Sequence, residues 1–576
     1  MTPGDARASV PFDLRILKSS LPWLSLILTI SPYLYFTFLN VDPVHDGWFS
    51  TPAAALAEGA VPYRDVVTSY GWFTPAFLSL IIKIFGFQLL YFRLVGFLVL
   101  FGICLLFIAL LQKSIGLNRS LVTVSIWLMI GLGQMTKDPQ ALPAWGLWPN
   151  QLIIFGTLLL LYLLLRSVHF SYATLTLIGV VAGITPWIRA QGVLLLASAL
   201  VVFGIRIYQT NSVNKYLRIT HLFSVALITF SAPLLYLFRV SAMDEWFWQT
   251  IEMPRTGEWI GMPNPVDWLI QNFGLAIFLT LTLFIVARLL ILLKISGKKS
   301  ILLFAPLLIL VSIFPFSKAP IESFVVIRKL HSLLYLYSNY NFYTLPVLVI
   351  LSATLFLVFK ILQKAFVSRG RSLIEMPSLV AMLGIPALTL IYYNFGHLWG
   401  VAPILVLSLL YFWKPTRDYN SHFGHFRQVV TVYSLLVALI AAPQVYLNLA
   451  KPTFSYSTSG LSGMKGQDNQ QVATVRNAIQ LLSQLPAESK VFYLCKDAIY
   501  STIEGRYLSD NLFYSSIMTR YDRRILIYRE PASDTNFVVY CPGSNTATIS
   551  ELTGTWALSD LNGNSAQSGL QIYERK

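Results

Sequence analysis

Apolar residues of this chain gather in long runs that are separated by short polar connections. Runs of about 17 to 25 apolar residues can cross a bilayer as helices. About thirteen such runs lie near residues 21–39, 88–112, 120–136, 150–166, 172–188, 190–208, 219–240, 267–293, 300–316, 339–359, 377–393, 399–413 and 428–449. The pattern predicts a polytopic α-helical membrane protein.

The pattern changes after residue 450, where the chain becomes polar and long apolar runs end. Apolar residues at three- and four-residue spacing predict an amphipathic helix over 467–485. Short apolar runs at 491–495, 537–541 and 570–573 predict buried strands. About 120 residues suffice for a small α/β domain. We therefore expect two parts, a transmembrane domain over 1–450 and a soluble α/β domain over 451–576.

The composition agrees with a membrane location. The 576 residues are 55% hydrophobic and only 12% charged, and soluble domains carry roughly twice that charged fraction. The net charge of +16 comes from basic residues scattered in the short connections, which is typical of membrane topology. We therefore exclude nucleic acid as a partner.

The distribution of Lys and Arg predicts the orientation. No small-residue cleavage site follows the first apolar run, so we expect an uncleaved first helix with a cytoplasmic N-terminus. Alternating the spans from there places the more basic connections in the cytoplasm, in agreement with the positive-inside rule; they include Lys113, Arg119, Arg206, Lys215 and Arg218. Residues 41–86 and the C-terminal part are then extracytoplasmic, on a multi-pass protein of the cytoplasmic (inner) membrane.

Residues 41–86 concentrate ionisable groups directly after the first apolar run. Ionisable groups at a membrane surface indicate function by default, and the alternative is an ordinary solvated loop. The segment 73–85 is too short for a span and predicts a helix lying along the outer interface. Tyr63, Tyr70, Trp72 and Phe73 would anchor it at headgroup depth.

The order of motifs in this stretch carries a family resemblance. His45-Asp46-Gly47 precedes a helical segment, which is followed by Pro62-Tyr63-Arg64-Asp65, by Tyr70-Gly71 and by an apolar segment that ends in Phe85-Gly86. This order resembles the first external loop of the GT-C class of polyprenyl-phosphate-dependent glycosyltransferases, which includes the protein O-mannosyltransferases and the lipid A aminoarabinose transferase. The resemblance implies a GT-C-like fold. It also implies transfer of a sugar from a polyprenyl-phosphate carrier to a glycan, lipid or protein acceptor on the outer face of the membrane.

The same resemblance implies the catalytic residues. The family keeps an acidic residue in this part of the loop, so Asp46 is the candidate general base that takes the proton of the acceptor hydroxyl. His45 stands where many relatives have a second acidic residue. It would orient Asp46, contact the acceptor or help Asp46 hold a divalent cation (Mg, Mn or Ca); no cofactor is certain. Asp42 is the competing base, and Gly47 favours Asp46 because the family has glycine there.

Other candidates would bind the substrates. Arg189 and Gln191 lie in Thr185-Pro186-Trp187-Ile188-Arg189-Ala190-Gln191-Gly192. The family commonly has a small residue, Arg and a polar or acidic residue there, and Arg189 would bind phosphate. The alternative is a simple loop charge. Asp65 would bind sugar hydroxyls or form a local ion pair with Arg64. The remaining candidates are Tyr70, Asp138, Lys318, Arg328 and His397.

Two rival functions stay open. One is an oligosaccharide polymerase or ligase with the same base but a polyprenyl-diphosphate donor. The other is a transporter or flippase, which is less consistent with the sequence because inverted-repeat transporters show paired broken helices and none are visible.

The cysteines of the C-terminal part raise a separate question. Cys495 and Cys541 each end a predicted strand. If the two strands are neighbours in a parallel sheet, the cysteines could approach closely enough for a disulfide, which persists outside the cytoplasm. The alternative is two buried thiols, because free cysteine behaves as a small hydrophobe.

Overall fold

The fold is that of a computed structural model. It describes residues 14–42, 45–66, 68, 71–135, 147–166, 170–209, 214–252, 376–388, 400, 402–404, 406–407, 449–456, 459–486, 488–489, 491–494, 502, 535–540, 556–561 and 570–576. Most of the predicted spans between 267 and 359 and after 400, and the residues Tyr70, Asp138, Lys318, Arg328, His397, Cys495 and Cys541, lie outside the described residues.

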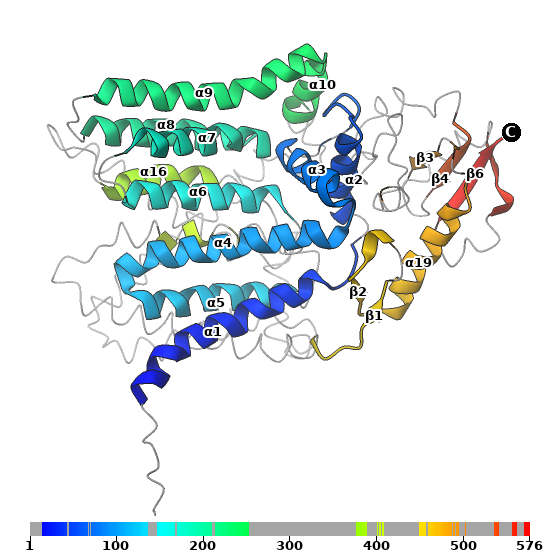
Figure 1. Cartoon of the computed structure of the whole chain (residues 1–576), viewed down its shortest axis with the longest axis horizontal. Coiled ribbons are helices and arrows are strands. Elements are labelled where there is room, and N and C mark those ends of the chain that lie inside the picture. The colour runs from blue at the N-terminus through cyan, green and yellow to red at the C-terminus, as the bar shows by residue number, and fades with distance from the viewer. Residues whose placement is uncertain are drawn as a thin grey trace, which may run out of the picture.

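A bundle of long helices forms the larger part of the molecule (Figure 1). Its helices are α1 (Leu14–Thr37), α4 (Leu89–Ile115), α5 (Leu117–Met135), α6 (Pro149–Arg166), α7 (Tyr172–Ile188), α8 (Gly192–Gln209), α9 (Lys215–Arg239) and α16 (Met376–Leu388). Among the described residues, α4, α6, α8 and α9 are long and apolar enough to cross a membrane. The membrane-type helical fold is thus confirmed in outline, and the number of thirteen spans stays a prediction.

Short connections make successive helices antiparallel neighbours. Gly116 ends α4 with φ 80°, a left-handed conformation that glycine adopts without steric cost, and α5 begins at the next residue. The chain therefore turns back at once, and α4 packs beside α5. The α4–α5 and α8–α9 connections lie at one end of the bundle (Figure 1). The helix ends that meet there contain the predicted cytoplasmic residues Lys113, Arg119, Arg206, Lys215 and Arg218.

The opposite end of the bundle carries short helices. They are α2 (His45–Ala57), α3 (Phe73–Phe85), α10 (Met243–Phe247) and the π-helical turn η3 (Trp248–Glu252). The helix predicted over 73–85 is confirmed, with Leu78 buried on one side and Ile84 and Phe85 exposed on the other. Exposed apolar residues suit the predicted position at the membrane interface, which stays a prediction.

The C-terminal part contains a helix and a four-stranded sheet. Helix α19 (Asn469–Ser483) is followed by β3 (Val491–Leu494), β4 (Phe537–Tyr540), β5 (Trp556–Leu558) and β6 (Gln571–Arg575), in the sheet order β3-β4-β6-β5. The predicted helix and three predicted strands are therefore confirmed. The predicted helix face packs in one core with the strands; it consists of Val472, Val475, Ile479 and Leu482. The domain boundary at 450 stays a prediction.

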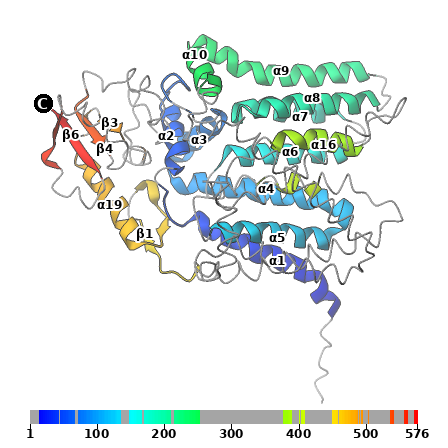
Figure 2. The same cartoon turned by 180° about the vertical axis from the view of Figure 1, so that it is seen from behind.

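The C-terminal part lies at the same end of the bundle as α2 and α3, as Figures 1 and 2 both show. It begins with a small antiparallel pair, β1 (Phe454–Ser455) and β2 (Lys465–Gly466). This pair adjoins the connection between α1 and α2.

The sheet register sharpens the cysteine prediction. β3 and β4 are parallel neighbours, and Leu494 pairs with Tyr540, the residues that directly precede Cys495 and Cys541. Neighbouring strands lie about 4.7–4.9 Å apart, within the roughly 4.4–6.8 Å Cα separation of disulfides. We expect mass spectrometry of unreduced protein to find a peptide pair joined through these cysteines. Alkylation of both thiols under denaturing, non-reducing conditions would contradict the bridge.

Candidate functional site

An ion pair holds Asp46 at the start of α2. The guanidinium of Arg93, in the first turns of α4, donates from Nη2 to Asp46 Oδ2 at 2.6 Å and from Nε to Asp46 Oδ1 at 3.2 Å. Arg93 is fully buried, and the Asp46 side chain is 7% exposed. A two-pronged contact between a guanidinium and a carboxylate fixes both partners in geometry as well as in charge.

Arg93 also binds the end of α1. Its Nη1 donates to the Leu39 carbonyl oxygen and its Nη2 to the Asn40 carbonyl oxygen, both at 2.6 Å. The buried guanidinium thus donates hydrogen bonds to residues on both sides of the α1–α2 connection, which compensates for the burial of its charge. Arg93 was not among the sequence candidates because it lies inside the apolar run 88–112. The signal that could have found it is the charge itself, since an ionisable residue within a span is rare and usually functional.

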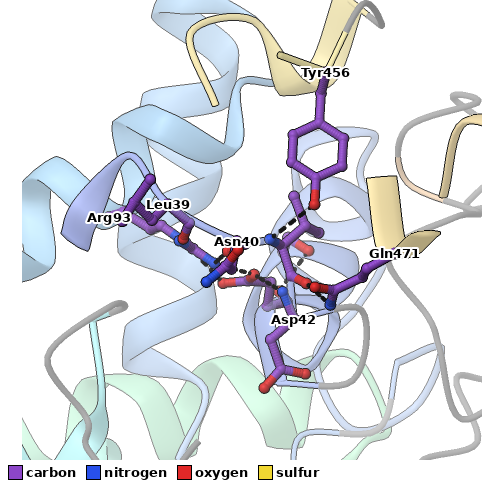
Figure 3. Close-up of polar contacts among 9 residues, drawn as sticks. Leu39, Asn40, Asp42, Arg93, Tyr456 and Gln471 are labelled. Carbon is purple, nitrogen blue, oxygen red and sulfur yellow. Dashed lines mark hydrogen bonds and ion pairs between the residues drawn. The ribbon is translucent and has the colours of Figure 1, made fainter. Parts of the chain in front are cut away.

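The ion pair bears on the predicted role of Asp46 as a base. Burial raises the pKa of the Asp46 carboxyl, and the charge and hydrogen bonds of Arg93 oppose that rise. A raised pKa by itself would suit Asp46 to act as a base. Both of its oxygens, however, accept hydrogen bonds: Arg93 binds each of them, and the Asp42 N–H donates to Oδ2 at 2.8 Å. The Asp42 side chain points away from Arg93 (Figure 3).

Arg189 and Gln191, predicted together, do meet in the structure. Arg189 follows the last residue of α7, donates from Nε to Gln191 Oε1 at 3.0 Å, and donates from Nη1 to Asn150 Oδ1. Asn150 belongs to the first turn of α6, so three successive helix ends supply one polar cluster. Arg189 is only 9% exposed, which is more burial than a simple loop charge would show.

Asp65 forms the local ion pair that the sequence left as an alternative. Arg64 Nε lies 2.9 Å from Asp65 Oδ1, with side chains 44% and 25% exposed. Asp65 Oδ2 also accepts from the Val61 N–H at 2.7 Å, and Arg64 donates to the Val240 carbonyl oxygen at 3.0 Å. The hydrogen bond and charge of Asp65 raise the pKa of Arg64. The pair therefore ties the loop after α2 to the end of α9.

Gln249, which the sequence did not suggest, holds the same loop from the inside. Its Nε2 donates to the Tyr63 carbonyl oxygen at 2.8 Å, and its Oε1 accepts from the Thr68 N–H at 3.2 Å. Tyr63 has φ 67°, and its hydroxyl accepts from the Trp72 N–H at 3.3 Å. Burial raises the pKa of Tyr63 to about 12, so the phenol stays neutral. These contacts fix the backbone between α2 and α3.

Gly71 brings this loop against the end of α7. Its N–H donates to the Ile188 carbonyl oxygen at 3.0 Å, and a Cβ at this position would overlap the Trp187 carbonyl group. The absence of a side chain is therefore required for the loop to dock directly beside Arg189. This explains in packing terms why glycine stands at position 71.

We expect Gly71→Ala to destabilise the protein by about 1–3 kcal/mol, the usual cost of forcing extra atoms into a packed site. Thermal unfolding in detergent measures the effect. Gly204→Ala, in α8, is the matched control because its Cβ would meet only an ordinary contact with Phe223. Equal unfolding temperatures for the two variants would contradict the close docking of the loop.

These groups lie at one end of the bundle. Helix α3 contacts both α2, which carries Asp46, and α7, which Arg189 directly follows. The His45 side chain lies outside the part of the chain that the structure describes. Within the described residues no group of three or more His, Cys, Asp or Glu could hold a metal ion, and a cation at His45 and Asp46 stays a prediction.

Comparisons with known proteins complete the description. No protein-family model and no curated protein matches the chain. Among solved structures, the chain is similar to the crystal structure of ArnT from Cupriavidus metallidurans bound to undecaprenyl phosphate, at 12% sequence identity and a TM-score of 0.43, over 97% of each chain.

Proposed function

We propose that this protein is an inverting glycosyltransferase of GT-C type that moves a sugar from a polyprenyl-phosphate carrier to a glycan, lipid or protein acceptor. The observation that carries the proposal is the arrangement at the α1–α2 connection. Two carboxylates, Asp42 and Asp46, lie four residues apart in a connection that a fully buried arginine holds in place. Few proteins bury a charge in a helical bundle without a functional reason.

Asp42 is our proposed base. In the reaction, the acceptor hydroxyl oxygen attacks the anomeric carbon from the face opposite the phosphate, the bond from carbon to phosphate oxygen breaks, and the hydroxyl proton passes to the base. A base loses its negative charge when it takes the proton, and Asp46 could not do so without weakening the ion pair with Arg93 that holds the connection. Asp46 already uses both oxygens on Arg93 and on the Asp42 N–H. Asp46 is then the group that orients Asp42.

Arg189 is our proposed phosphate contact, together with Gln191 and with Asn150 as its support. Charge-assisted hydrogen bonds from a guanidinium stabilise the negative charge that grows on the departing phosphate. Its two neighbours accept hydrogen bonds from the guanidinium at Nε and Nη1 and so hold it in place. Besides a base, the reaction needs a cation that stabilises the departing phosphate. Arg189, at the same end of the bundle as Asp42, is positioned to supply it.

The direct test is donor consumption by purified protein in detergent, with undecaprenyl-phosphate sugars as the first probes. Release of the polyprenyl phosphate, together with a new glycosidic bond to the acceptor, would support the proposal. Release of a diphosphate carrier would favour the polymerase or ligase. Movement of the intact sugar lipid across vesicles without bond cleavage would favour the transporter.

Sidedness has its own test, and we propose that the active site faces the outside. In a background with the three native cysteines replaced by alanine, an impermeant maleimide added to intact cells should label Gln470→Cys and not Asn118→Cys. Both positions are exposed, one in the C-terminal part and one at the opposite end of the bundle. Labelling of Asn118→Cys alone would reverse the orientation and remove the argument for a lipid-linked donor.

A further inference from the structure

The C-terminal part touches the connection that carries Asp42. Its strand β2 pairs with the end of α1 through the backbone: the Asn40 N–H donates to the Lys465 carbonyl oxygen at 2.6 Å, and the Lys465 N–H donates to the Phe38 carbonyl oxygen at 2.8 Å. Residues 38–40 therefore gain a strand-like partner from a segment more than 400 residues away in the chain.

Further contacts come from the residues around β2 (Figure 3). The Gln467 N–H donates to Asn40 Oδ1 at 2.9 Å, and Gln471 Nε2 donates to the Val41 carbonyl oxygen at 3.2 Å. The Val41 N–H donates to the Tyr456 hydroxyl at 3.5 Å. Both backbone groups of Val41, the residue before Asp42, thus have partners in the C-terminal part.

Asn40 is the residue on which these contacts converge. It has φ 51°, in the left-handed region that asparagine tolerates better than most residues. Its N–H binds Lys465, its side chain binds Gln467, and its carbonyl oxygen binds Arg93. Arg93 in turn binds Asp46. The C-terminal part and the ion pair therefore act on the same short stretch of backbone.

We propose that residues 454–472 position the active site, with Asn40 and Gln471 as positioning residues for Asp42. The inference rests on the proposed function. A base must lie within hydrogen-bond reach of the proton that it removes, and a displacement of about 1 Å can lower a rate by about 100-fold. Val41 and Asp42 lie outside helices and strands, so the geometry of these two residues depends on the partners that bind them.

Gln471→Glu tests the inference because it keeps the side-chain shape and replaces the amide donor with an acceptor facing the Val41 carbonyl oxygen. We expect kcat to fall by about 10- to 100-fold, with the KM for the lipid donor near the wild-type value. Hydrogen exchange at the amides of residues 38–42 should become faster. Gln470→Glu is the matched control: it adds the same charge one residue earlier, at an exposed position, and should change neither measurement.

Asn40 provides an independent pair of variants. Asn40→Asp keeps an acceptor for the Gln467 N–H and tolerates positive φ, whereas Asn40→Ala loses both features. We expect Asn40→Asp to retain most of kcat and Asn40→Ala to lose it in the same way as Gln471→Glu. If Gln471 and Asn40 had a purely structural role, their variants would have a lower unfolding temperature. They would not show a fall in kcat at an unchanged KM.

The possible failures are distinguishable. Two results for Gln471→Glu would overturn the positioning inference. One is an unchanged rate of hydrogen exchange at the amides of residues 38–42. The other is faster hydrogen exchange there with an unchanged kcat. Neither result would affect the proposed function, which wild-type activity tests. Wild-type protein that consumes no polyprenyl-phosphate sugar would overturn the proposed function and, with it, the inference.

Discussion

Asp42→Asn is expected to lower kcat by about 10²–10⁴-fold, the usual contribution of a general base, in a protein that still folds. The amide keeps the shape of the side chain but cannot take a proton. The Asp42 backbone N–H that binds Asp46 is unaffected by the substitution. Both are measured in detergent: turnover of the lipid-linked sugar gives kcat, and thermal unfolding shows whether the variant folds.

Asp65→Asn is the control for Asp42→Asn, because Asp65 is a loop carboxylate whose partner is the half-exposed Arg64. Its effect on turnover should be small. If Asp42→Asn turned over substrate at the wild-type rate, the base would have to be Asp46. Asp46→Asn is a poor first test of that role, since it also weakens a buried ion pair, and activity and stability would fall together.

Arg93→Met should destabilise the protein by about 3–5 kcal/mol, the cost of removing one partner of a buried ion pair. The substitution leaves the Asp46 carboxylate buried without its cation, and it leaves the carbonyl groups of Leu39 and Asn40 without their donor. Thermal unfolding measures the loss. Transfer should fall as well, because the α1–α2 connection loses the group that holds it.

Two further variants show whether the ion pair itself is responsible. Arg166→Met removes an exposed arginine at the other end of the bundle and should change the unfolding temperature little. Adding Asp46→Leu to Arg93→Met should recover part of the stability, because replacing both charges with apolar groups removes the unpaired carboxylate. An Arg93→Met protein as stable as wild type would contradict the structural role of the pair.

The sequence alone predicted the elements whose cause is local. Long apolar runs predicted the helices of the bundle, because only a helix satisfies its own backbone in an apolar environment. The buried face of α19 also has a local cause, because residues three and four apart lie on one side of a helix. The spacing of Val472, Val475, Ile479 and Leu482 therefore predicted that face. The pairing of Arg64 with Asp65 was predicted as one of two alternatives because the residues are adjacent.

Only the tertiary structure decided which distant residues meet. Arg93 lies 47 residues from Asp46 in the chain, and its position in an apolar run gave no sign of its partner. The contact between Asn40 and Gln467 spans 427 residues and is made by a backbone N–H, which every residue except proline possesses. Side-chain patterns record burial and local spacing, whereas these contacts depend on how the helix ends and the C-terminal part pack together. For that reason the sequence placed two candidate carboxylates in one connection, and the fold determined that one is held by Arg93 while the other points elsewhere.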